Sequence, residues 1–141
     1  MLKPEEPLDP NLVKALIASE SSFEPQKCIP AGKKHEHARG LMQITDETLS
    51  IVGSHKDEVK DHFICATQNE VMDPSTNICI GVRWLLTKKV DAKARLHYAA
   101  TWDDAVAEYK GILEDVKNGK DPKNEMKTFH TLYNQLLAAS K

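Results

Sequence analysis

The stretch that decides the fold covers residues 9–20 and reads DPNLVKALIASE. Asp followed by Pro is typical of a helix start, because the Asp side chain accepts hydrogen bonds from free backbone amides and proline fits the first turn. Behind this start, apolar residues recur with helical spacing on one stripe: Leu12, Val13, Leu16 and Ile17. The stretch therefore predicts an amphipathic helix whose apolar face packs inward.

The same helix start occurs twice more, at Asp73-Pro74 and at Asp121-Pro122, each time ahead of apolar residues with helical spacing. Weaker helical patterns follow three other polar residues: Asp46, Ser54 and Thr101. No segment shows the sustained alternation of a half-buried strand. We therefore expect an all-α fold, with loops at about residues 24–40, 64–72 and 87–100.

The length and composition fit one globular domain, since 141 residues are 40% hydrophobic and 28% charged. We expect an N-terminal tail over residues 1–8 and a single domain over residues 9–141. The net charge of -2 provides no cationic field to hold a nucleic-acid backbone, so nucleic acid is excluded as a partner. No apolar run approaches the roughly twenty residues of a membrane span, and residues 1–7 lack the apolar run of a signal peptide.

Glu20 is the first candidate for chemistry. It lies four residues after Leu16 and three after Ile17, so it continues the apolar stripe toward the core. Apolar surroundings favour the protonated form of a carboxyl, which is the form that a general acid needs near neutral pH. A Glu that bonds backbone amides at a helix end fits the same spacing, which leaves both interpretations open.

The segments that follow Glu20 carry a family resemblance. In chain order they are Glu20-Ser21-Ser22-Phe23, Ile29-Pro30-Ala31-Gly32, Gly40-Leu41-Met42-Gln43-Ile44, Asp73-Pro74-Ser75-Thr76-Asn77-Ile78 with Gly81, and Ala105-Val106-Ala107-Glu108-Tyr109. Their order and spacing resemble the catalytic domain of the soluble-type lytic transglycosylases, whose fold is related to goose-type lysozyme. The resemblance implies a lysozyme-like single domain of about six to seven helices around a glycan-binding groove.

The resemblance also implies an activity. It predicts a bacterial cell-wall enzyme that cleaves the β-1,4 bond between N-acetylmuramic acid and N-acetylglucosamine in peptidoglycan. Glu20 would be the single acid/base, because the muramoyl 6-hydroxyl replaces water as nucleophile and closes a 1,6-anhydro ring. The expected partners are glycan strands, with no cofactor and no identified protein partner. The expected site of action is the periplasm or cell envelope.

Other matched residues take supporting roles by resemblance. Gln43 would hydrogen-bond the sugar, and Met42 would line the groove wall. Tyr109 would stand near Glu20, its hydroxyl directed toward the carboxyl or the substrate, and Ser21 would bond the carboxylate. Three of them have a structural alternative, since Met42 and Tyr109 fit the core and Ser21 fits a helix cap. For Asn77 we expect a structural bond within the first turn of its helix, with contact to the groove as the alternative.

The sequence departs from the family pattern at three places. Ile29 stands where the family has Ser, and Glu108-Tyr109-Lys110 replaces the common Ala-Tyr-Asn. The loop over residues 32–40 is longer than usual and contains His35-Glu36-His37. Two histidines without a third ligand at a compatible spacing do not make a metal site, so we predict none. The loop is expected to be a solvated segment or a lip that contacts the glycan or its stem peptide.

Two other functions fit the same pattern. A lysozyme-type muramidase would use a second carboxylate to activate water, and the candidates for that carboxylate are Glu24, Glu36, Asp46 and Asp73. A catalytically weak module that binds glycan or a protein could use the same scaffold, because a fold does not imply an activity.

Overall fold

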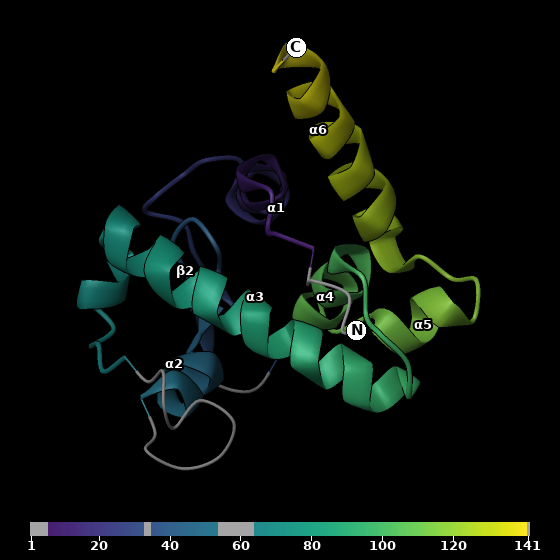
Figure 1. The fold of residues 1–141 in the computed structure, drawn as a ribbon. Coiled ribbons are helices and arrows are strands. Elements are labelled where there is room, and N and C mark those ends of the chain that lie inside the picture. Colours follow the sequence, from purple (N-terminus) through teal and green to yellow (C-terminus); the bar gives the residue numbers. More distant parts are fainter. Residues whose placement is uncertain (1–5, 33–34, 54–63, 141) are drawn as a thin grey trace.

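The computed structural model describes residues 6–32, 35–53 and 64–140, and the helical fold expected from the sequence is confirmed in them. The α-helices are α1 (Pro10–Ser21), α2 (Asp46–Val52), α3 (Pro74–Leu96), α4 (Trp102–Tyr109), α5 (Leu113–Lys117) and α6 (Glu125–Ala139). Two short 3-10 turns accompany them, η2 (Glu70–Met72) and η3 (Pro122–Asn124). Figure 1 shows the long α3 crossing the molecule, with α2 toward one of its ends and α4 and α5 toward the other.

The three Asp-Pro pairs do mark helix starts. At α1 and α3, the carboxylates of Asp9 and Asp73 accept hydrogen bonds from first-turn amides, at 2.8 and 3.0 Å. Asp121 precedes the turn η3 instead, and its carboxylate accepts bonds from two amides at the beginning of α6. The helices expected after Asp46 and Thr101 are present as α2 and α4, and the one expected after Ser54 lies outside the described residues.

Two loop predictions need correction. The loop expected over residues 87–100 is wrong for its first ten residues, because α3 continues to Leu96 and ends where His97 adopts a left-handed φ of 60°. That segment contains neither glycine nor proline and is rich in Lys, Ala, Arg and Leu, which favour helix without needing an apolar stripe. Local propensity therefore extends the helix past the point where the hydrophobic pattern fades.

The loop expected over residues 24–40 contains two strands, β1 (Cys28–Pro30) and β2 (His37–Arg39). They pair antiparallel, and β2 also pairs antiparallel with β3 (Ile44–Thr45), which gives the order β1-β2-β3. Strands of two or three residues are too short to show alternation, so the sequence pattern could not reveal them. The three cysteines, Cys28, Cys65 and Cys79, are free and exposed.

The core forms where α1 packs on α6 and α3 packs on α4. Leu12, Leu16 and Ile17 of the predicted stripe are buried, which confirms the inward face of α1. Phe129 of α6 is completely buried in the same core. Among the described residues, no helix combines the length and apolar character needed to span a membrane.

Asn77 fastens the small sheet to α3. Its side chain is completely buried; Oδ1 accepts from the Met42 amide at 2.8 Å, and Nδ2 donates to the carbonyls of Arg39 and Val71 at 2.9 Å each. A Cβ atom at Gly40 would lie 2.2 Å from this Nδ2, so the close approach needs glycine there. The bond expected within the first turn of α3 is therefore wrong, because these partners all lie outside that helix.

Replacing Asn77 with Ala should destabilise the protein strongly. The change leaves the buried Met42 amide, the buried Val71 carbonyl and the partly buried Arg39 carbonyl without this partner, and each buried group left unpaired costs about 1 to 3 kcal/mol. We expect the free energy of unfolding to fall by about 3 kcal/mol or more in urea titrations. The exposed Asn134 of α6 provides the control, since Asn134→Ala should stay within about 0.5 kcal/mol of wild type. Equal, small effects at both positions would contradict this role of Asn77.

Candidate active site

Glu20 occupies the last turn of α1, directly before a sharp change of backbone direction. Ser22 and Phe23 both have left-handed φ values, 53° and 62°, which end the helix there. The Glu20 side chain is 20% exposed, and its Oε1 accepts a hydrogen bond from Lys110 Nζ at 2.8 Å. The carboxyl is thus partly buried, but its nearest partner is an ammonium group rather than the apolar surroundings expected from the stripe.

Lys110 is the C-cap residue of α4, and its side chain is only 4% exposed. Its Nζ also donates to Ser19 Oγ at 2.9 Å, while Lys27 Nζ donates to the Glu20 backbone carbonyl at 2.8 Å. Two cations therefore converge on the C-terminal end of α1, where the helix dipole favours positive charge. The sequence pointed to Lys110 only as a departure from the family's Ala-Tyr-Asn; it did not predict the pairing with Glu20.

Tyr109 lies close enough to Glu20 for the two side chains to interact electrostatically. Burial, and then the negative charge of Glu20, raise the pKa of the Tyr109 hydroxyl well above its ordinary value. The hydroxyl therefore keeps its proton, which it donates to the Met42 carbonyl at 2.6 Å. The structure thus places Tyr109 near Glu20, with its hydroxyl bonded to the Met42 backbone.

Gln43 follows Met42 in a strained turn. The backbone φ of Gln43 is 51°, and the residue is 8% exposed. Its side-chain Nε2 donates to the Gly40 carbonyl at 3.0 Å. Its Oε1 is buried and has no hydrogen-bond partner among the described residues. An unpaired buried acceptor is costly in a folded protein, and it is suited to a ligand that brings a donor.

Met42 and Ser21 are more deeply buried than the resemblance implied. The Met42 side chain is fully buried, and a Cβ atom at Gly81 would lie 2.3 Å from its Sδ, so this side chain packs directly on α3. Ser21 is 1% exposed, and its hydroxyl donates to the Ile17 carbonyl at 3.0 Å rather than to the Glu20 carboxyl. These two side chains therefore stabilise the backbone that carries Gln43 and Glu20 and do not face solvent.

Three of the four candidate second carboxylates make structural bonds. The Asp46 carboxylate accepts from the His37 amide and the Arg39 guanidinium; burial raises the pKa of Asp46, but these bonds lower it below its ordinary value. Hydrogen bonds from an amide and a hydroxyl in the first turn of α3 lower the pKa of Asp73. Glu36 accepts from an amide in the first turn of α2. These contacts give each carboxylate a role in the fold.

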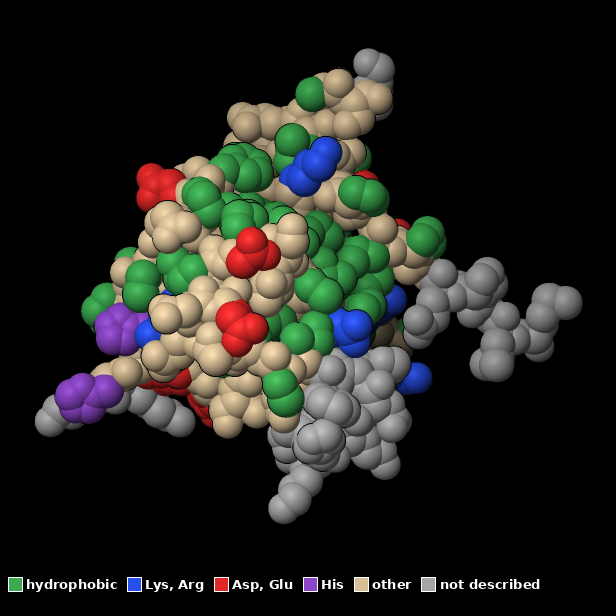
Figure 2. All heavy atoms as spheres, turned by 90° about the vertical axis from the view of Figure 1, so that its left-hand side faces the viewer, with side chains coloured by type: hydrophobic (Ala, Val, Ile, Leu, Met, Phe, Trp, Pro, Cys, Tyr) green, Lys and Arg blue, Asp and Glu red, His purple; other side chains and the backbone are tan. Residues whose placement is uncertain are grey.

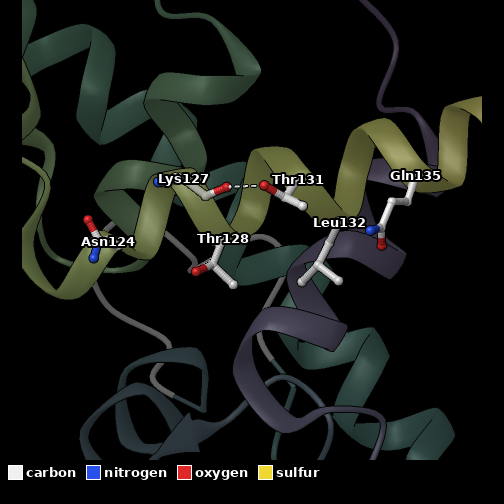
Figure 3. A pocket seen from close by; sticks show the side chains of 6 residues that line it. All are labelled: Asn124, Lys127, Thr128, Thr131, Leu132 and Gln135. Atoms are coloured by element: carbon white, nitrogen blue, oxygen red, sulfur yellow. Dashed lines mark hydrogen bonds between the residues drawn. The ribbon is translucent and has the colours of Figure 1, made fainter.

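The face drawn in Figure 2 and the pocket along α6 show no cluster of catalytic or metal-binding side chains among the described residues. Figure 2 shows isolated acidic side chains among apolar and polar ones, and the described residues form no continuous patch of Lys and Arg on that face. A pocket along α6 has a volume of about 360 Å³. Figure 3 shows its lining residues, which are Asn124, Lys127, Thr128, Thr131, Leu132 and Gln135. None of these residues is an acid or a histidine. The described residues also contain no cluster of three or more His, Cys, Asp or Glu side chains that could hold a metal ion.

Comparison with known proteins identifies the class. Residues 3–131 match the family described as "Transglycosylase SLT domain", and the chain belongs to this family. Membership supports, at the level of the family, a lytic transglycosylase-type function that cleaves peptidoglycan in the cell envelope. No curated protein and no solved structure matched the chain.

Proposed function

We propose that this protein is a peptidoglycan lytic transglycosylase with Glu20 as its single acid/base and residues 9–141 as its catalytic domain. Its reaction cleaves the β-1,4 bond between N-acetylmuramic acid and N-acetylglucosamine and leaves a 1,6-anhydromuramoyl end. The observation that carries the proposal is the Glu20 carboxyl, partly exposed at the end of α1 and held by Lys110, in a chain of this family. The proposed place of action is the periplasm.

The two halves of the reaction use Glu20 in opposite protonation states. In the first, its carboxylic acid donates the proton to the glycosidic oxygen, and N-acetylglucosamine leaves from the anomeric carbon of the muramoyl sugar. In the second, the carboxylate takes the proton of the muramoyl 6-hydroxyl while that oxygen bonds to the anomeric carbon. The proton returns to Glu20, and no water is consumed. Because the hydroxyl is tethered to the reacting sugar, its effective concentration is high.

The remaining site residues support binding. Gln43 Oε1 is a buried acceptor without a partner among the described residues, and we assign it a hydroxyl or amide donor of the sugar. The Tyr109 hydroxyl donates to the carbonyl of Met42, the residue before Gln43. This bond fixes the Gln43 turn relative to α4. Met42 and Ser21 act from within the core, Met42 beneath the turn and Ser21 within the last turn of α1.

Glu20→Gln should abolish most of the activity. The amide keeps the size of the side chain but carries no acidic proton for the leaving oxygen, so turnover of purified peptidoglycan should fall at least about a hundredfold. Glu24→Gln is the matched control, because Glu24 is exposed and lies beyond the end of α1. It should retain the wild-type rate. Near-wild-type turnover by Glu20→Gln would contradict the assignment, and a large loss with Glu24→Gln would favour the two-carboxylate muramidase.

The products should distinguish the two reactions. Intramolecular attack gives anhydro-muropeptides that lack a reducing end, whereas hydrolysis adds water and creates one. We expect the fragments of digested glycan strands to resist borohydride reduction and to be about one water lighter than hydrolytic fragments by mass spectrometry. Mostly reducible ends would indicate a muramidase, and binding without fragments would indicate a glycan-binding module.

A further inference from the structure

Lys27 lies in the segment that follows α1, and every residue from Ser22 to Pro30 except Lys27 is exposed. Its ammonium donates to the Glu20 backbone carbonyl at 2.8 Å. Carbonyls in the last turn of a helix lack a partner within the helix, and a cation there also interacts favourably with the helix dipole. Lys27 therefore ties this segment to the end of the helix that carries the candidate acid/base.

The backbone carbonyl of Lys27 makes a second set of contacts, to the turn that carries Gln43. It accepts from the Gly40 amide at 2.7 Å and from Gln43 Nε2 at 3.4 Å. The Gly40 carbonyl accepts from the same Nε2 at 3.0 Å and from the Gln43 backbone amide at 3.2 Å. Because two carbonyls face Nε2, the side-chain amide is held in the orientation that leaves Oε1 without a partner among the described residues.

One residue thus connects the two halves of the candidate site. The side chain of Lys27 holds the Glu20 backbone, and its carbonyl holds the Gln43 turn. The connection through α4 is different, because Lys110 holds the carboxyl of Glu20 and not its backbone. Lys110 therefore bears on how the carboxyl is oriented, whereas Lys27 bears on how far the end of α1 lies from the Gln43 amide.

We propose that Lys27 is a positioning residue for cleavage, which sets the separation between the Glu20 carboxyl and the sugar that Gln43 Oε1 binds. Proton transfer needs the carboxyl within hydrogen-bond reach of the glycosidic oxygen, and a small displacement of the bound sugar lowers the rate strongly. Loss of the ammonium contact therefore lowers kcat and leaves KM for a long glycan strand nearly unchanged. This inference rests on the proposed function of Glu20.

The test compares kcat and KM for soluble glycan strands in wild type, Lys27→Met and Lys27→Arg. Methionine has nearly the length of lysine but no ammonium, so we expect kcat to fall about tenfold or more while KM changes less than about twofold. Lys27→Arg keeps a cationic donor and should recover most of the rate. Lys14→Met, which removes an exposed lysine from α1, should match wild type. A wild-type kcat in Lys27→Met, or an equal loss in Lys27→Arg, would overturn the proposal.

A double-mutant comparison separates positioning from a general loss of stability. In Gln43→Met the side-chain amide is absent, so Lys27 no longer has a sugar-binding acceptor to place. We expect Lys27→Met to lower kcat less than about twofold in this background, because the two changes remove the same interaction. The same factor in both backgrounds would show a purely structural role and would contradict the proposal.

A third measurement is independent of activity. The side-chain amide signals of Gln43 in NMR spectra, assigned by their loss in Gln43→Met, report the contacts of Nε2. We expect these signals to shift in Lys27→Met and to stay in place in Lys14→Met. Unshifted signals, or failure of Lys27→Met to fold as judged by circular dichroism, would also overturn the proposal. Full activity of Glu20→Gln would instead overturn the proposed function, and the amide signals would still report the effect of Lys27.

Discussion

The arrangement of the candidate site depends on two hydrogen bonds that hold the Met42 backbone, one to its amide and one to its carbonyl. Its amide donates to the buried Asn77 Oδ1 of α3 at 2.8 Å, and its carbonyl accepts from the Tyr109 hydroxyl of α4 at 2.6 Å. The side chain between them packs on Gly81. Since α3 and α4 pack closely on each other, the backbone of this one residue is fixed by two helices that also contact each other. The strained turn at Gln43 follows directly, so its Oε1, which has no hydrogen-bond partner among the described residues, has a defined position.

The second half of the site is built on the same helix α4. Tyr109 anchors the Gln43 turn, and the next residue, Lys110, holds Glu20 at the end of α1. Two adjacent residues thus connect the candidate acid/base with the candidate sugar-binding amide. Packing of α1 against α6 keeps the helix that carries Glu20 in place. The fold therefore fixes an acid, a cation and a hydrogen-bond acceptor without any of them lying on a long free loop.

Local sequence patterns predicted the parts of this arrangement that local physics determines. Asp-Pro pairs and apolar spacing gave the helix starts and the inward face of α1, because capping and helical periodicity act within a few residues. The bonds of Asn77 to Met42 and of Lys110 to Glu20 join residues 35 and 90 positions apart, and no local pattern encodes them. The same limit applies to the short strands, whose pairing and not their composition defines them. The family resemblance pointed to Glu20 and Gln43 as candidates, but it carried no information on a lysine where the family has asparagine.

The central claim is that glycan binds between Glu20 and the Gln43 turn. The most direct test is NMR mapping of a peptidoglycan tetrasaccharide on Glu20→Gln, which prevents turnover while preserving the shape of the site. The account predicts that the backbone and side-chain amide signals perturbed by the sugar cluster at the end of α1, at Gln43 and at the end of α4. Perturbations confined to the α6 pocket of Figure 3, with none at Gln43, would contradict it.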